Sequence, residues 1–302
     1  MSYQEDLQGN QDRALVKKAD STIQPRESKY GDGVNQRVFE LPYKNFLIGV
    51  NLGDITEAPT EAVMCPTTPV LEIGGGAVER ALYRAVGRET YDAYAHQLMS
   101  IIERVRNGTD ADRLLAAQEF LDLIQTKTKL PLNASPEQAV VDILALTGKV
   151  NWSADMNRKP EHVSLLYGMA IAAPSGNLEK RGIQTIVLTN VTPEKKDGMT
   201  VRDMAMFTYN ACIAALRAGA DSITIPAIGT GFASMYGFGL RPDESLIGFL
   251  EGVKQFVDDI TSQNESVMHR IDYNMYVKPS EKTALEIATL MGGIEASAIL
   301  TE

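Results

Sequence analysis

The chain has 302 residues, 44% of them hydrophobic, and a formal net charge of −10. This length allows one large α/β domain or two small ones, each with a packed core. No stretch is long and apolar enough to span a bilayer, so we expect no contact with a membrane. The acidic balance argues against a nonspecific grip on nucleic acid, which needs clustered Lys and Arg.

Cysteine and histidine usage restricts the chemistry further. Cys65 and Cys212 are the only cysteines. They are too few for a disulfide framework, and reduced thiols in a cytoplasmic protein are the expected state. His96, His162 and His269 are scattered and lack the spacing of a metal site. We therefore expect no metal and no cofactor.

The N-terminal region differs in composition from the rest of the chain. Residues 1–38 lack an apolar period and are rich in polar and charged side chains. That composition predicts a flexible tail rather than a secretory signal. Residues 39–302 form the predicted folded domain.

Two short apolar runs open this domain. Residues 45–50 and 62–64 have the composition of buried strands. A run of three glycines follows at 74–76, and apolar residues then recur at helical spacing between 78 and 85. The order is therefore strand, strand, glycine loop and helix.

The stretch from residue 89 to residue 160 has a different pattern. Apolar side chains recur there at helical spacing, as between Leu98 and Val105. Ser135-Pro136 is typical of a helix start: Ser caps, Pro occupies the first position, and Gln138 can complete a capping box. We see no strand pattern and predict an all-helical insertion at about residues 95–163.

An alternating pattern resumes after the insertion. Short apolar runs with strand character are separated by helical patterns, which predicts an α/β fold with a largely parallel or mixed sheet covered on both faces. The predicted strands are 168–173, 185–188, 222–228 and 271–277, and the predicted helices are 204–216, 246–256 and a last one capped by Ser280.

Two features of the first half suggest ligand contacts. Asp54 follows the first strand, at the sheet edge where α/β folds bind ligands, and its carboxylate can accept a hydrogen bond from an exocyclic amine such as that of adenine. The alternative is an Asp that only forms a turn. Gly74-Gly75-Gly76-Ala77 precedes a helix, so backbone N–H groups there can bind an anion. The alternative is a plain surface loop, because the run fits neither the dinucleotide fingerprint nor a P-loop.

A second glycine-rich segment follows the strand at 222–228. Gly229-Thr230-Gly231-Phe232-Ala233-Ser234 can form a nest of N–H groups for a diphosphate. Such a nest explains how an acidic protein can bind an anion without basic residues. The alternative is again a surface loop.

Taken together, these segments resemble the macro domain family. The resemblance rests on Gly53-Asp54-Ile55-Thr56, on the glycine run with its helix, and on the Ile-Pro-Ala-Ile-Gly-Thr-Gly segment ending at Gly231. It covers about residues 45–91 and 168–278. It implies a three-layer α/β/α fold with a mixed central sheet, interrupted here by the insertion, and ADP-ribose or an ADP-ribosylated substrate as the partner.

The resemblance also implies a role for each site residue. Asp54, with the Ile55 backbone beside it, would bind adenine, and Tyr276 would pack on the base or else serve the core. The residues expected to line the distal ribose and diphosphate are Gly74, Gly75, Gly76 and Ala77, and those expected to surround the diphosphate are Gly229, Thr230, Gly231, Phe232 and Ala233.

The chain departs from the family at its reactive positions. Hydrolytic members have Asn-Ala-Ala-Asn where this chain has Cys65-Pro66-Thr67-Thr68, so the asparagine that positions the distal ribose is absent. The acidic residue that helps activate water in one branch would fall at Glu79, which is otherwise an ordinary solvated helix residue. Cys65 has no base beside it in sequence and is better explained as a buried structural thiol.

Two functions follow from this pattern. The missing Asn favours a module that binds ADP-ribose without efficient turnover. Glu79 and the two glycine loops keep open a hydrolase that removes ADP-ribose from protein or small-molecule conjugates. The sequence leaves the oligomeric state and the role of the insertion open.

Overall fold

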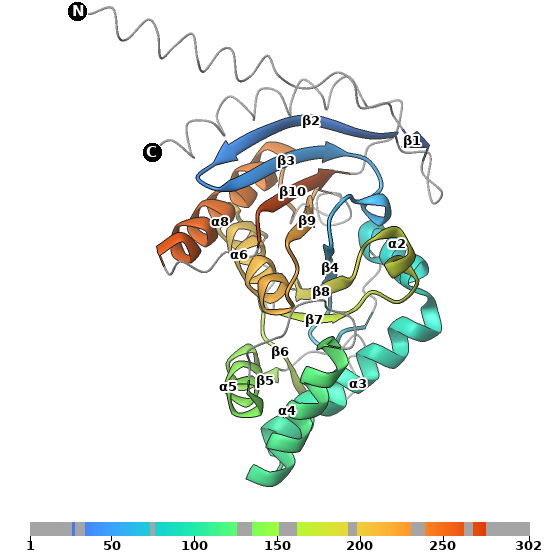
Figure 1. Cartoon of the computed structure of the whole chain (residues 1–302), viewed down its shortest axis with the longest axis vertical. Coiled ribbons are helices and arrows are strands. Elements are labelled where there is room, and N and C mark those ends of the chain that lie inside the picture. Colours follow the sequence, from blue (N-terminus) through green and yellow to red (C-terminus); the bar gives the residue numbers. More distant parts are fainter. Residues whose placement is uncertain are drawn as a thin grey trace, which may run out of the picture.

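The structure, a computed structural model, describes residues 26–27, 34–72, 76–125, 135–150, 162–192, 198–230, 239–262 and 268–275 (Figure 1). Its centre is an eight-stranded sheet with the order β1-β2-β3-β10-β9-β4-β8-β7. The strands are β1 (Arg26–Glu27), β2 (Val34–Tyr43), β3 (Phe46–Leu52), β4 (Ala62–Thr67), β7 (Ala170–Pro174), β8 (Thr185–Asn190), β9 (Ser222–Pro226) and β10 (Arg270–Met275).

The sheet is mixed, as expected. The strands β3, β10, β9, β4 and β8 run parallel to one another. At the two sides of this block, β2 pairs antiparallel with β3, and β7 pairs antiparallel with β8. The predicted strands at 45–50, 62–64, 168–173, 185–188, 222–228 and 271–277 correspond to β3, β4, β7, β8, β9 and β10.

Helices cover both faces of the sheet. The α-helices are α2 (Ala77–Val86), α3 (Arg88–Asn107), α4 (Asp110–Gln125), α5 (Pro136–Leu146), α6 (Val201–Arg217) and α8 (Pro242–Ser262), and two short 3-10 helices are η1 (Ile55–Glu57) and η2 (Gly176–Arg181). The helices α6 and α8 lie on one side of the sheet and α2 on the other (Figure 1). Within the described residues, no helix combines the length and hydropathy needed to cross a membrane.

Side chains alternate between the two faces along each central strand. Ala62 and Met64 of β4 pack in the core under α6 and α8, whereas Val63 and Cys65 pack in the core under α2 and α3. The helices α6 and α8 can approach closely because Gly248 has no side chain. A Cβ at this position would lie 2.5 Å from the Val201 carbonyl oxygen. Each face of the sheet therefore has its own apolar core.

The insertion contains strands as well as helices, so the prediction of an all-helical insertion is wrong. After α3, α4 and α5, the strands β5 (Thr147–Val150) and β6 (His162–Leu165) form an antiparallel pair. The pair is attached to the main domain, because the Leu165 N–H donates to the Pro69 carbonyl (2.9 Å). The predicted cap at Ser135 is confirmed: its Oγ accepts from the Gln138 N–H at 3.3 Å. The Gln138 side chain bonds to Asp142 (3.1 Å).

The sheet begins earlier than the sequence predicted. A domain start at residue 39 falls inside β2, and β1 places residues 26–27 beside it. Pro42 and the polar residues of this strand obscure its pattern. They are tolerated because β1 pairs with β2 only at residues 34 and 35, so the rest of β2 is at the edge of the sheet.

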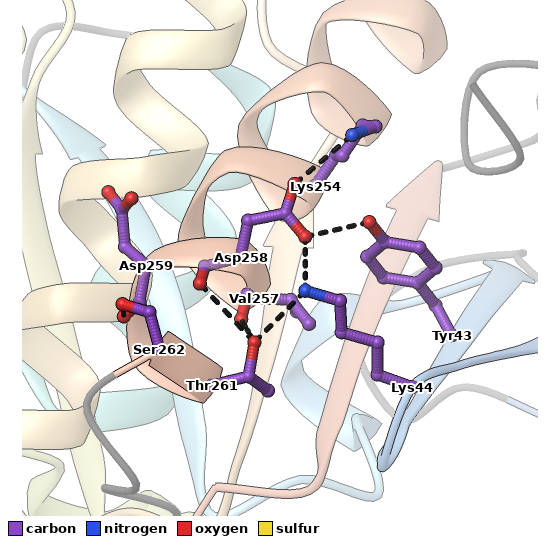
Figure 2. Close-up of polar contacts among 8 residues, drawn as sticks. All are labelled: Tyr43, Lys44, Lys254, Val257, Asp258, Asp259, Thr261 and Ser262. Carbon is purple, nitrogen blue, oxygen red and sulfur yellow. Dashed lines mark hydrogen bonds and ion pairs between the residues drawn. The ribbon is translucent and has the colours of Figure 1, made fainter.

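The hairpin that joins β2 to β3 is fastened to α8 by one carboxylate (Figure 2). Asp258 Oδ1 accepts from the Tyr43 hydroxyl (2.8 Å) and lies 2.6 Å from Lys44 Nζ, and Oδ2 lies 3.1 Å from Lys254 Nζ. Lys44 Nζ also donates to Thr261 Oγ1 (3.0 Å). Partial burial alone would raise the pKa of Asp258, but the bonds from Lys44, Tyr43 and Lys254 outweigh it and lower the pKa to about 2.

The stabilisation by Asp258 should depend on pH. Its pKa in the folded chain lies below the usual 3.8, so its contribution is present above about pH 4 and is lost as the pH falls toward 2. Urea denaturation should show Asp258→Asn less stable than the wild type at about pH 6, with the two converging near the acid end. Glu251→Gln, at an exposed position of the same helix, is the control. A difference that stays constant over this range would contradict the prediction.

Candidate functional site

The chain leaves the sheet toward opposite faces after two neighbouring strands. After β4 it leads to α2, which packs on the face covered by α3. After β9, which pairs with β4, it leads to α8 on the other face. Ligands of open α/β sheets bind beyond the carboxyl ends of the strands at such a switch point. This edge of the sheet is therefore the candidate site.

Asp54 lies at this edge, directly beyond β3. It is buried, with 5% of its surface exposed, and its Oδ1 caps η1 by accepting from the Thr56 N–H (2.9 Å). Gly53 anchors the turn to β10, because its N–H donates to the Met275 carbonyl (2.9 Å). Ile55 is buried in the core on the α2 side. Asp54 thus forms a turn, as the alternative explanation in the sequence analysis proposed. The same turn places it at the candidate site.

The segment from β4 to α2, residues 68–76, is called the first loop below. The hydroxyls of Thr67 and Thr68 donate to the Glu72 carbonyl (3.2 and 3.1 Å), and Thr68 Oγ1 accepts from the Glu72 N–H (3.0 Å). Gly76 is the N-cap of α2 and has no side-chain cap, and Ala77 is the first, exposed residue of the helix. The first turn of a helix offers N–H groups to an anion, so the start of α2 is chemically suited to a phosphate.

A buried polar cluster lies under the first loop. Tyr91 of α3 donates its hydroxyl to the Leu71 carbonyl (3.3 Å). Cys65 is fully buried, and burial together with the charge of Glu79 raises its pKa well above the usual value. Burial, with Cys65 beside it, also raises the pKa of the Tyr91 phenol. The two groups therefore stay protonated, which agrees with the prediction of an unreactive structural thiol.

Glu79 occupies a different environment from the solvated one considered above. Only 4% of its surface is exposed, and it belongs to the buried face of α2. Its charge acts on Cys65 and Tyr91. Its Oε2 also lies 4.0 Å from the position of a Cβ on Gly76, so the carboxylate is next to the start of the helix.

The loop after β9 is called the second loop, residues 227–240. Gly229 has φ +82°, and a Cβ there would lie 3.1 Å from the Leu240 nitrogen, so the position requires glycine. The Leu240 N–H donates to the Gly229 carbonyl (3.1 Å). Thr230 Oγ1 donates to the Ala227 carbonyl (3.1 Å). Ser245 of α8 donates its hydroxyl to the carbonyl of Ile228 (3.1 Å).

Several predicted site residues lie outside the described residues. These are Gly74, Gly75, Gly231, Phe232, Ala233 and Tyr276, together with the helix predicted to start at Ser280. The structure brings the other predicted residues to one edge of the sheet. The sequence did not reveal the supporting bonds from Thr67, Thr68, Tyr91 and Ser245. The departure from Asn-Ala-Ala-Asn was a signal for Thr67 and Thr68 only, and Tyr91 and Ser245 had none.

Removal of the Tyr91 hydroxyl should weaken the support of the first loop. Tyr91→Phe keeps the ring, which packs edge-on against Tyr83 (5.3 Å between centroids), but leaves the buried Leu71 carbonyl without this donor. We expect a loss of about 1–3 kcal/mol in the free energy of unfolding, measured by urea denaturation. Tyr83→Phe, which removes an exposed bond to Asp92, is the matched control and should cost much less. Equal losses in the two variants would show that the buried bond has no special role.

Comparison with known proteins identifies the fold. No protein-family model and no curated protein matches the chain. Among solved structures, a point mutant of the Oceanobacillus iheyensis macrodomain shares 17% identity at a TM-score of 0.50, over 90% of this chain and 98% of its own. The Trypanosoma brucei macrodomain in complex with ADP-ribose shares 13% identity at a TM-score of 0.45, over 84% of this chain and 74% of its own. The first of these similarities, together with the mixed sheet between two helical layers, shows that the chain has the macrodomain fold.

Proposed function

We propose that the chain binds ADP-ribose or a related ADP-ribosyl nucleotide between the two loops, as a reader without efficient turnover. The observation that carries this proposal is the order of groups along the sheet edge. Asp54 follows β3, Gly229 follows β9 and the start of α2 follows β4, with β10 between β3 and β9. An acceptor for a base, a glycine turn and a helix N-terminus thus occur in the order base, diphosphate, distal ribose.

The length of this edge suits such a ligand. Three strand spacings separate β3 from β4, which corresponds to about 14 Å at 4.7–4.9 Å each. That distance is enough for a base at one end and a sugar at the other. A diphosphate in the middle would meet the second loop, where backbone N–H groups can bind it.

Backbone donors also reconcile anion binding with the charge of the protein. At a net charge of −10, a long-range attraction for phosphate is absent, so recognition has to come from short-range N–H donors. The same charge is the reason why we expect no nucleic-acid partner. The two cysteines are buried and unpaired, which supports a cytoplasmic location as part of the proposal.

The reactive positions favour binding over turnover. Thr67 and Thr68 belong to the segment that replaces Asn-Ala-Ala-Asn, and their hydroxyls bond within the first loop. Glu79 is buried beside Cys65 and Tyr91. A general base must instead come within about 3 Å of the atom whose proton it removes. The alternative, hydrolysis of an ADP-ribosyl bond, is supported by the position of the Glu79 carboxylate next to the start of α2.

Titration with ADP-ribose tests the proposal. We expect calorimetry to show binding whose affinity changes by only a few-fold between about 0.05 and 0.5 M salt, because neighbouring N–H groups rather than distant charges bind the diphosphate. A basic patch would instead lose affinity steeply with salt. The absence of both binding heat and a thermal shift at about millimolar ligand would reject the proposal.

A turnover assay of the wild type and of a Glu79 variant distinguishes the binding function from the hydrolase function. We expect the wild type to release little ADP-ribose from an ADP-ribosylated protein. If turnover does occur, Glu79→Gln should reduce its rate by about 10²–10⁴-fold and leave the affinity within a few-fold, because Gln keeps the shape but cannot accept a proton. Glu89→Gln, at an exposed position of α3, is the control. Turnover that survives Glu79→Gln would remove this residue from the mechanism.

A further inference from the structure

The Asp54 turn is supported by an arginine that is distant in sequence. Arg181 Nη1 donates to the Thr56 carbonyl (3.1 Å) and to Thr56 Oγ1 (3.2 Å), and it pairs with Glu57 Oε1 (2.7 Å). The Thr56 N–H in turn donates to Asp54 Oδ1 (2.9 Å). A continuous chain of hydrogen bonds therefore runs from the guanidinium through Thr56 to the Asp54 carboxylate.

The arginine itself is firmly placed. It ends η2, and Leu178 of this short helix is buried in the core on the α2 side. A Cβ on Gly176 would lie 2.6 Å from the Val86 carbonyl oxygen, so η2 is in backbone contact with the end of α2. The side chain of Arg181 is only 20% exposed. Arg181 therefore links η1 to η2, and η2 in turn contacts α2, the helix that starts at the first loop.

The turn needs such support, because η1 has only three residues. A single 3-10 turn has poor hydrogen-bond geometry of its own. Arginine is suited to this position because its planar group offers several donors in fixed directions and always carries its charge. Glu57 pairs with that charge at 2.7 Å, so the guanidinium is engaged by the turn.

The orientation of the Asp54 carboxylate decides which base it can select. A carboxylate only accepts hydrogen bonds, and its two oxygens have room for about four. The same group can therefore cap η1 and accept from a base. It attracts an amino group on carbon 6 of a purine and repels an oxo group there, provided that its direction is fixed.

We propose that Arg181 is a positioning residue that sets the selection of a 6-amino purine over a 6-oxo purine, acting through Thr56 on Asp54. This inference rests on the proposed function and adds to it the residue that controls base selectivity. It is distinct from a phosphate contact by Arg181, which would act equally on both bases.

The test compares ADP-ribose with IDP-ribose, in which a 6-oxo group replaces the 6-amino group. Calorimetric titrations use the wild type, Arg181→Met, Arg181→Lys, Asp54→Asn and the double variant Asp54→Asn, Arg181→Met. Lys180→Met, at an exposed neighbouring position, is the control. Thermal unfolding of each variant verifies that it is folded.

The wild type should prefer ADP-ribose by about tenfold or more, the effect of one hydrogen bond to a charged group. Arg181→Met should lower this ratio by about fivefold or more, mainly through weaker ADP-ribose binding, with Arg181→Lys in between. Lys180→Met should keep the wild-type ratio. In Asp54→Asn, the neutral amide offers a donor as well as an acceptor to the base, so the ratio should approach one. Adding Arg181→Met to Asp54→Asn should then change the ratio no further.

Other outcomes overturn the inference. An unchanged ratio in Arg181→Met, an equal loss for both ligands, or additive effects in the double variant would each show that Arg181 does not act through Asp54. If Arg181→Met fails to fold, the ratio in Arg181→Lys decides. Failure of the proposed function is distinguished by the wild type, because neither ligand would then bind it, and the inference would fall with the function.

Discussion

The pairing of β10 with both β3 and β9 sets the geometry of the candidate site. The last residues of β10 bond to the loops that follow both neighbours. The Met275 carbonyl accepts from the Gly53 N–H (2.9 Å), and the Asn274 carbonyl accepts from the Ala227 N–H (2.8 Å). The Asn274 side chain also donates to the Gly53 carbonyl (3.0 Å). One strand thus determines how far η1 lies from the second loop, so the spacing of these two turns follows from the sheet itself.

The register of these strands is reinforced by a buried charge. Asp272 of β10 is fully buried, lies 3.0 Å from Arg270 Nε, and accepts from the Asn51 side chain of β3 (2.9 Å). Burial raises the pKa of Asp272, whereas Arg270 and Asn51 act against that rise. A Cβ on Gly49 would clash with the Asp272 carboxylate. Buried ion pairs add little net stability, but a shift of one residue would turn these side chains to the opposite face. The pair therefore favours the one register that aligns the site.

Local patterns predicted most of the fold and the positions of the turns at the candidate site, and long-range contacts account for the rest. The buried strands were predictable because fully covered strands are continuous apolar runs. The strand β5 was not predictable, because it begins at Thr147 directly after α5 ends at Leu146, and no glycine or proline lies between them. At the site, glycines and Asp54 marked the turns. The bonds that support them join residues 125, 20 and 17 positions apart, at Arg181, Tyr91 and Ser245, and no local period in the sequence reports such contacts.

The attachment of the insertion has a consequence for how this fold can vary. Among the described residues, two bonds at the boundaries of the insertion reach carbonyls of the first loop only two residues apart: Leu165 of β6 bonds to Pro69, and Tyr91 of α3 bonds to Leu71. The elements that lead into and out of the insertion thus support the first loop. The helices α4 and α5 pack mainly on each other and on α3, and neither of them makes one of these two bonds. Changes in the surface of α4 and α5 can therefore accumulate without loss of either bond to the first loop, so new binding surfaces can arise there while this edge of the sheet stays constant.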